Sequence, residues 1–452
     1  MEAFKSFNKR TSQRHLTGVF MAYVAQSTAR GRDGTSPDSL TSTLPDVVRL
    51  VQRKLRSNTY RFTPYRQLLI SRGATRRPRV LSLPTARDRV ALRALADILL
   101  DVFPEARPLI PQATARQVRS AISTTTFNYY IRLDIEDFYP SIQHEQVRRC
   151  LRSRIRKREL VDVLLRAIAT PTLPDGHHPC VPVEQGLPQG LAISNVLAEL
   201  AVGSIDQAMQ GRSDCNYFRF VDDILIVCDA ENAPTIEKLV KNLCDGIGLT
   251  CHDQKSAGGK SLAGQLAEGV EYLGYVFYPG RVSVRERSVR DTEAAIVRVL
   301  TAYKHEVREV GTASSGSVAR CLWRVNLVIT GCRYKGKSLG WLHYFQEMTD
   351  LSLLKRLDLL VVKLLGRFGL SGTIKPKTFL TAYYKIQTEV CTATSYSPNL
   401  DAFDTTVMRR QLVKFFPNEH YASKSDSEVR RAYFRMVDRT VRRFAIDISI
   451  PS

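Results

Sequence analysis

Several features are scarce or absent in this chain of 452 residues. No uninterrupted apolar run reaches 18 residues, and residues 1–5 do not open a signal-peptide core. We therefore expect a soluble, cytoplasmic protein without a membrane span. The nine cysteines are scattered and include no Cys-x-x-Cys pair, which argues against a disulfide framework and against a structural zinc site. Acidic residues are few: 44 Asp and Glu stand against 66 Lys and Arg, a formal net charge of +22. This excess predicts a polyanionic partner, with nucleic acid favoured over a membrane surface.

Two adjacent carboxylates, Asp222 and Asp223, lie between the apolar, β-branched and aromatic segments 216–220 and 224–228. This pattern predicts a β-hairpin with acids at its tip. Crowded like charges are costly unless a cation neutralises them, and Mg²⁺ takes oxygen ligands from one or two carboxylates. On its own the pair fits a solvated turn as well as a metal site.

Two further segments precede this hairpin. Residues 131–142 predict a strand that carries Asp134, followed by an aromatic turn and a helix start at Ser141. Residues 185–195, Gln-Gly-Leu-Pro-Gln-Gly-Leu-Ala-Ile-Ser-Asn, predict a loop that leads into a helix over 191–209. An acid on a strand, a Gly-Leu-Pro-Gln-Gly loop and a strand–Asp–Asp–strand unit, in this order, resemble motifs A, B and C of reverse transcriptases.

The resemblance implies the catalytic groups. Asp134, Asp222 and Asp223 would hold two Mg²⁺ ions, with Asp222 the more direct ligand of the adjacent pair. Glu136 and Asp137 are rivals of Asp134 on sequence alone, and its position within the motif favours Asp134. Lys255 stands where the family has a lysine that is a proposed general acid for the leaving pyrophosphate; a solvated lysine is the alternative.

The resemblance also implies how substrates would be held. Tyr139 would be the aromatic side chain that excludes a ribose 2′-hydroxyl, so that DNA rather than RNA is made; a core aromatic is the alternative. Gly186 and Gly190 would let the loop backbone approach a substrate closely. The predicted nucleotide contacts are Tyr139, Gln189 and three arginines of a basic hairpin and the helix after it, Arg72, Arg79 and Arg87. The predicted primer grip is Tyr272, Leu273 and Gly274.

These motifs predict an α+β right-hand polymerase with fingers, an antiparallel-sheet palm and a helical thumb. We expect N-terminal helices and fingers over 1–128 and a palm over 129–285, with a finger insertion around 143–184. A helical thumb over 286–370 and a basic, helical C-terminal extension over 371–452 would follow. The apolar stretch 351–365 predicts a buried thumb helix.

The predicted activity is RNA-directed DNA synthesis from dNTPs, with an RNA template, a DNA product and no membrane partner. Residues 324–331 and 340–345 resemble bacterial reverse transcriptases of the unknown-group and abortive-infection lineage. That resemblance implies a role in anti-phage defence with a dedicated non-coding RNA as template. A retron-type or group II intron-derived reverse transcriptase without a defence role, and a nucleic-acid-binding protein with a polymerase fold, remain alternatives. The priming mode and a homo-oligomeric state stay open.

Overall fold

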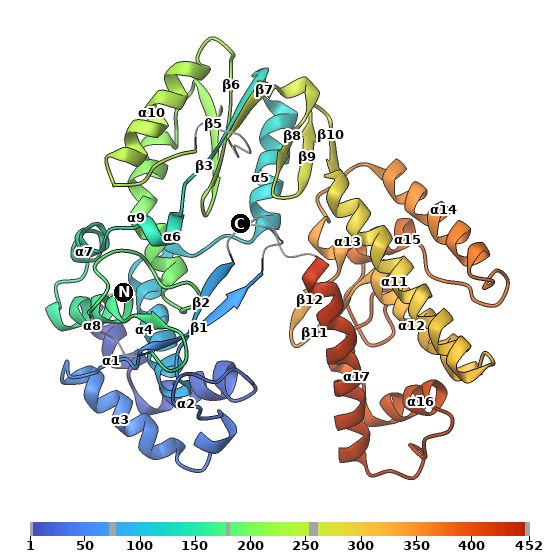
Figure 1. Cartoon of the computed structure of the whole chain (residues 1–452). Helices are drawn as coiled ribbons and strands as arrows, with labels where there is room; N and C mark the ends of the chain where they lie inside the picture. Colours follow the sequence, from blue (N-terminus) through green and yellow to red (C-terminus); the bar gives the residue numbers. More distant parts are fainter. Residues whose placement is uncertain (1–2, 72–77, 178–180, 253–260, 448–452) are drawn as a thin grey trace. The chain divides into compact units, whose positions relative to one another are not determined.

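The computed structural model describes residues 3–71, 78–177, 181–252 and 261–447. By their contacts they form two compact units (Figure 1). The first comprises Met1–Ile110 and Phe127–Gln265, and the second comprises Pro111–Thr126 and the residues from Leu266 onward. Helices and antiparallel strands are mixed, which confirms the predicted α+β class. The unit with the main sheet ends at Gln265, and the palm boundary at residue 285 stays a prediction.

A four-stranded antiparallel sheet organises the first unit (Figure 1), in the order β5-β6-β3-β7. Its strands are β3 (Tyr129–Asp134), β5 (Cys215–Phe220), β6 (Asp223–Cys228) and β7 (Leu262–Gln265). In β3 the alternate residues Ile131 and Leu133 are fully buried, as expected for one core-facing side of a pleated sheet. In β6 all residues of 224–228 are fully buried, so both faces of this strand are covered. The helices α9 (Ser194–Met209) and α10 (Ala233–Asp245) pack on each other, and α10 also contacts β3. The predicted hairpin with acids at its tip is confirmed.

The N-terminal part of the first unit is helical, as predicted. Its elements are α1 (Ala3–Arg10), α2 (Gln13–Val19), the π-helical turn η1 (Phe20–Val24), η2 (Asp38–Leu40), α3 (Leu44–Arg56), α4 (Ala86–Val102) and η3 (Pro104–Ala106). The predicted basic hairpin forms from β1 (Tyr65–Ile70) and β2 (Arg79–Leu83), with β4 (Thr172–Leu173) alongside β1. Thr85 caps the N-terminus of α4, because its hydroxyl accepts a hydrogen bond from the Asp88 amide at 3.1 Å.

The helix start predicted at Ser141 is wrong. A short helix, α6 (Phe138–Ser141), ends there, and the next helices are α7 (His144–Arg152) and α8 (Arg158–Ala169). The fixed φ of Pro140 suits the first turn of a helix, so the turn forms before Ser141. Ile142 then adopts extended backbone with ψ 120°, which separates α6 from α7.

The second unit contains a small sheet and a helical body. Its sheet is formed by β8 (Val270–Tyr272), β9 (Tyr275–Tyr278) and β10 (Arg281–Val284), with η4 (Leu266–Glu268) before it; α5 (Pro111–Thr124) also belongs to this unit. The helical body begins at Glu286. It comprises α11 (Glu286–Val310), α12 (Ser315–Thr330), α13 (Trp341–Tyr344), α14 (Leu351–Arg367), α15 (Phe379–Thr388), η5 (Leu400–Ala402), α16 (Thr405–Phe415) and α17 (Asp426–Asp447), with the hairpin β11 (Cys332–Tyr334) and β12 (Lys337–Leu339) between α12 and α13.

The helix α14 is buried on one side only, which qualifies the prediction of a buried helix over 351–365. Leu357 is fully buried, but Leu359 and Val362 are each 63% exposed. The C-terminal residues, whose fold could not be predicted, share a core with the helix α12. That core contains Leu327, Leu412, Tyr433 and Val437. No helix among the described residues is long and apolar enough to cross a membrane.

Candidate active site

The predicted catalytic acids meet at one end of the four-stranded sheet. Asp134, the last residue of β3, is the direct cross-strand partner of Asp223, the first residue of β6. The Ile135 amide donates to the Asp222 carbonyl at 3.0 Å, which ties the hairpin turn to the strand that carries Asp134. Asp134 is only 6% exposed. Strand pairing therefore brings together Asp134 and Asp223, which are 89 positions apart in the chain.

Arg132 is a site residue that the sequence analysis did not single out. Its Nε and Nη2 donate to Oδ1 and Oδ2 of Asp223 at 2.8 and 2.7 Å, a bidentate pair. Side chains two residues apart on a strand lie on the same face, so Arg132 and Asp134 share a face. The signal was present in the sequence: a charged residue two positions before the acid in an otherwise apolar strand.

His252 lies between two acids of the motif. Its Nε2 is 3.4 Å from Oδ2 of Asp134, and its Nδ1 is 3.0 Å from Oε1 of Glu136. Asp137 is exposed and has a left-handed backbone with φ 39°. Of the three neighbouring acids only Asp134 pairs with the Asp222-Asp223 hairpin through the sheet. Lys255 lies outside the described residues.

The donor set suits a hard divalent cation by its chemistry, because carboxylate oxygens are the ligands that Mg²⁺ prefers. One of the three predicted carboxylates, that of Asp223, forms a salt bridge with Arg132 in this conformation. Within the described residues, no three His, Cys, Asp or Glu side chains form a cluster that could already hold a metal ion.

The turn between β5 and β6 has a strained backbone. Phe220 and Asp223 are cross-strand partners, so the turn consists of only Val221 and Asp222. Val221 has φ 59°, a conformation that β-branched residues rarely adopt. Glycine is usual at such a position in a two-residue hairpin turn. The surroundings must therefore hold this turn in place.

Arg219 supplies that support from the strand β5. Its Nη1 donates to the Val221 carbonyl at 3.1 Å, and its Nη2 lies 2.6 Å from a carboxylate oxygen of Glu199 and 2.6 Å from one of Asp206. The Arg219 side chain is only 5% exposed, and its two acidic partners are 20% and 21% exposed. Burial disfavours the charge, but both acids outweigh it, and the pKa of Arg219 is raised well above its ordinary value.

Sequence reasoning also missed this network, although two signals for it exist. Arg219 is a lone cation between aromatic residues in an otherwise apolar strand. Glu199 and Asp206 are seven residues apart in α9, which places them on one face of a helix. The three charges therefore join the strand before the acids to the helix after the Gly-Leu-Pro-Gln-Gly loop.

Tyr139 lies beside the acids, half-buried against the core of the first unit. Its hydroxyl donates to Oδ1 of Asn195 at 2.9 Å, which fixes the direction of the ring. Burial, with the charges of Glu199 and Asp222, raises the pKa of Tyr139 to about 12, while Arg79 and Arg219 act in the opposite direction. Asp222 and Arg79 are therefore both close enough to Tyr139 to change its pKa. The predicted steric role of Tyr139 stays a prediction.

The loop 185–195 is held between two other segments. The Leu187 amide donates to the Tyr139 carbonyl at 2.8 Å, and the Gln189 carbonyl accepts from the Ser82 amide of β2 at 2.7 Å. Gly186 and Gly190 have φ 90° and 100°. A Cβ atom on Gly186 would lie 2.9 Å from the Pro140 carbonyl oxygen, and one on Gly190 would lie 3.2 Å from that of Ser82. These glycines thus permit a close approach to the protein's own backbone, and their approach to a substrate stays a prediction.

The predicted nucleotide-binding arginines have different surroundings. Arg79 begins β2 and acts electrostatically on Tyr139. Arg87 packs inward: its Nη2 donates to the Thr63 hydroxyl at 3.1 Å and lies 3.2 Å from the fully buried carboxylate of Asp88. Arg72 lies outside the described residues. The structure gives Arg87 a packing role, and its contact with a nucleotide stays a prediction.

The predicted primer grip is a tight turn in the second unit. Leu273 and Gly274 have φ 50° and 82° and connect the partners Tyr272 and Tyr275. The Leu273 carbonyl accepts a hydrogen bond from the Tyr344 hydroxyl at 3.1 Å. Tyr272 is fully buried and Leu273 is 4% exposed. Their side chains are therefore enclosed, and the backbone at Gly274 is what a primer could reach.

The comparisons with known proteins agree with these motifs. Residues 71–277 match the family described as reverse transcriptase (RNA-dependent DNA polymerase). A protein of *Schizosaccharomyces pombe*, described as an uncharacterized 91 kDa protein in cob intron, is 26% identical over 195 residues, which cover 41% of this chain and 23% of that protein. The chain thus spans under a quarter of this curated relative.

Two solved structures are similar over part of their length. Apo telomerase from *Candida tropicalis*, truncated from its C-terminal domain, has a TM-score of 0.37 at 12% identity and matches 51% of this chain and 58% of that one. Telomerase from *Candida albicans*, in complex with the TWJ fragment of telomeric RNA, has a TM-score of 0.42 at 10% identity, covering 85% and 63%. The family match over residues 71–277 includes every strand of the sheet that presents the acids. Residues 71–277, which include the acid-bearing hairpin, are therefore similar to a reverse transcriptase domain.

Proposed function

We propose that the whole chain is an RNA-directed DNA polymerase that extends a primer with dNTPs on an RNA template. The observation that carries this proposal is the cross-strand pair of Asp134 and Asp223, with Asp222 in the adjoining turn. The reverse transcriptase domain around these acids supports it. The net charge of +22 supports it as well, because the template, primer and product are polyanions.

Asp134, Asp222 and Asp223 would hold the two Mg²⁺ ions that such a reaction uses. When bound, these ions lower the pKa of the attacking 3′-hydroxyl and neutralise charge on the phosphates during in-line displacement. The contribution of the chain itself is to position the three carboxylates. Strand pairing holds Asp134 against Asp223, and the Asp222 carbonyl is fixed by the Ile135 amide. Arg132 would hold the Asp223 carboxylate in place until a cation competes for it.

Tyr139 would select the sugar of the incoming nucleotide. The ring is held by its hydrogen bond to Asn195 and stands near Asp222. A bulky, fixed ring at this point leaves no room for a 2′-hydroxyl. The proposal therefore includes dNTPs as substrates in preference to rNTPs, and Gln189 and Arg79 as further nucleotide contacts.

The first test is primer extension on a primed homopolymer RNA by the purified full-length chain. Asp134→Ala and Asp222→Ala are each expected to lower the rate about a thousandfold, because electrostatic groups at the reacting centre carry most of the catalysis. Asp137→Asn is the matched control: it removes an exposed acid of the same motif, and asparagine tolerates a left-handed backbone. Equal activity of all four proteins would refute the proposed catalytic acids. Inactivity of the wild type on every primed template would favour a nucleic-acid-binding protein with a polymerase fold.

The second test concerns the sugar. Tyr139→Ala is expected to raise rNTP incorporation relative to dNTP incorporation by at least about tenfold, because the steric barrier is removed. Tyr139→Phe keeps the ring and should keep the discrimination. An unchanged ratio in Tyr139→Ala would remove Tyr139 from this role.

The biological role proposed here is anti-phage defence with a dedicated non-coding RNA as template. It is supported by the resemblance of residues 324–331 and 340–345 to defence-associated reverse transcriptases. The intron-encoded relative in *S. pombe* favours a second candidate, an intron-derived reverse transcriptase. Phage plating on cells with wild-type or Asp222→Ala protein separates the two. Equal plating across a broad phage panel would contradict the defence role, and enrichment of intron RNA with the protein would support the second candidate.

A further inference from the structure

Four helices of the second unit enclose a cavity that the polymerase reaction does not use. The cavity has a volume of about 800 Å³ and is lined by residues of α11, α12, α16 and α17 and of the segment between α16 and α17. α11 packs against α12 and α17, and α16 packs against α12 and α17. This volume lies within the range of sites that hold small organic ligands.

Part of the lining of this cavity is apolar. It includes Ala302 of α11, Leu412 of α16 and Met436 of α17. Two aromatic side chains, Phe416 and Tyr421, also line it, with their ring centroids 6.1 Å apart. Small apolar residues beside aromatic rings form a surface suited to a flat, weakly polar group.

Arginines from three helices also line the cavity. They are Arg298 of α11, Arg324 of α12, and Arg435 and Arg439 of α17, against a single acid, Glu419. Arg435 and Arg439 are both exposed, and among the described residues neither forms a salt bridge. They are four residues apart on one helix, an arrangement of like charges that weakens a helix. An anionic ligand would relieve this repulsion.

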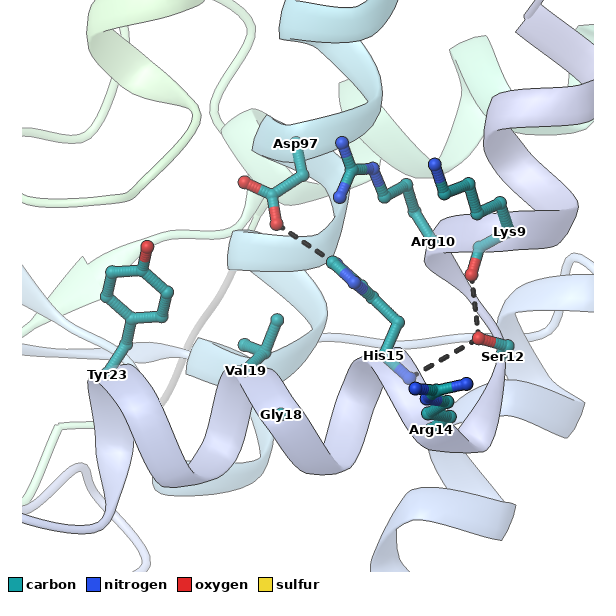
Figure 2. A pocket seen from close by; sticks show the side chains of 9 residues that line it. All are labelled: Lys9, Arg10, Ser12, Arg14, His15, Gly18, Val19, Tyr23 and Asp97. Carbon is teal, nitrogen blue, oxygen red and sulfur yellow. Dashed lines mark hydrogen bonds and ion pairs between the residues drawn. The ribbon is translucent and has the colours of Figure 1, made fainter.

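A hollow of the first unit shows the contrasting case (Figure 2). It is lined by Lys9, Arg10, Arg14 and His15. Two of these basic groups pair with acids of the same unit: His15 lies 3.0 Å from Asp97, and Arg10 lies 2.8 Å from Asp101. In the first unit, acids of the same unit therefore pair with two of the four basic side chains, whereas within the described residues Arg435 and Arg439 of the second cavity form no salt bridge.

We propose that the cavity between α11, α12, α16 and α17 binds unpaired nucleotides of a single-stranded nucleic acid. The bases would lie on the apolar lining beside Phe416 and Tyr421, and the phosphates would contact Arg435 and Arg439. Unpaired bases can be splayed into a pocket and packed on aromatic side chains, whereas a duplex keeps its bases stacked inside. A small inorganic anion would leave the apolar lining unused. This site needs no polymerisation, so it goes beyond the proposed catalytic function.

The test is binding of fluorescein-labelled 12-nucleotide RNA, 12-nucleotide DNA and a blunt 12-base-pair duplex to the full-length chain, measured by anisotropy without dNTPs. Arg435→Gln/Arg439→Gln removes two charges from the cavity. Arg430→Gln/Arg431→Gln removes two charges from the same helix outside the cavity lining and is the matched control. The cavity variant is expected to lose at least about tenfold in affinity for a single strand. Its salt slope should fall by about 1.4, because each lost phosphate contact to a single strand contributes about 0.7.

A filling variant separates base binding from charge alone. Ala302→Trp places a large ring in the cavity and leaves every arginine in place. We expect it to weaken single-strand binding and to leave duplex binding unchanged, while circular dichroism and thermal unfolding match the wild type. Comparison of the RNA and DNA strands then shows whether the sugar is read. Equal losses in the cavity and control pairs, or equal losses for single strand and duplex, would overturn the proposal. So would competition by a poly-glutamate peptide as effective as that by RNA.

Discussion

The buried Arg219 network should decide whether the acid-bearing hairpin keeps its shape. Arg219→Met removes a guanidinium that is 5% exposed and leaves Glu199 and Asp206, 20% and 21% exposed, without their counter-charge. Breaking a buried ion pair from one side costs about 3–5 kcal/mol. The Val221 carbonyl loses its donor as well. We therefore expect a loss of this size in the free energy of unfolding, measured by urea titration of the first cooperative transition.

A second variant separates the effect of Arg219 on stability from its effect on the position of the acid-bearing hairpin. Arg219→Met/Glu199→Gln/Asp206→Asn removes all three charges together, and such neutral replacements of buried ion networks are often tolerated. We expect it to recover most of the lost stability. Its polymerase rate should stay about tenfold to a hundredfold below that of the wild type, because Val221 has φ 59° and still lacks its donor.

The control is a neighbouring surface pair. Arg212 and Asp214, just before β5, are 34% and 35% exposed with a 2.6 Å contact. Arg212→Met should cost at most about 1 kcal/mol. The reasoning would be refuted if Arg219→Met were as stable as Arg212→Met. It would also be refuted if the triple variant had full activity.

Three further predictions concern single side chains. Arg132→Gln should lower the half-maximal Mg²⁺ concentration for dNTP incorporation about tenfold. The reason is that Arg132 competes with Mg²⁺ for the Asp223 carboxylate through charge-assisted hydrogen bonds worth about 1.5 kcal/mol. An unchanged Mg²⁺ concentration would count against this competition. Burial lowers the pKa of His343 from 6.5 to about 4, so as pH falls through this window only the unfolded chain gains the proton. The second unit should then lose about 3 kcal/mol of stability, which would appear as a fall in the urea midpoint of the wild type as pH decreases. The urea midpoint of His343→Gln should change less with pH, and identical pH profiles for the two proteins would contradict this prediction. Val221→Gly should stay within about 1 kcal/mol of wild-type stability because it relieves a strained φ, whereas Val227→Gly at a fully buried strand position should cost about 3 kcal/mol; equal costs would exclude strain at Val221.

Much of the fold follows from local pattern. Apolar, β-branched and aromatic segments on both sides of Asp222 and Asp223 indicate the hairpin, and Thr85 marks a helix start through the capping chemistry of its hydroxyl. The error at Ser141 has a local cause as well, because Pro140 favours a helical first turn and lies in the short helix Phe138–Ser141, which ends where a helix was predicted to begin. The C-terminal residues could not be placed, because their core forms with α12, which is distant in the chain.

The site was predictable only in part. The acids are recognisable because three motifs occur in a fixed order. Arg132 and Arg219 were missed because a single charged residue in a strand does not reveal its partner until the strands are paired. The sequence indicates that Gly186 and Gly190 allow a close approach, but it does not reveal that the backbone of Pro140 and of Ser82 lies against them.

The most direct test of the central claim is dNTP incorporation by the purified full-length chain with Mg²⁺, on the RNA that co-purifies with it. The wild type should yield a product that resists RNase and is destroyed by DNase, and Asp222→Ala should yield none. A product that is equal in both proteins, or that is RNase-sensitive, would contradict DNA synthesis at Asp134, Asp222 and Asp223.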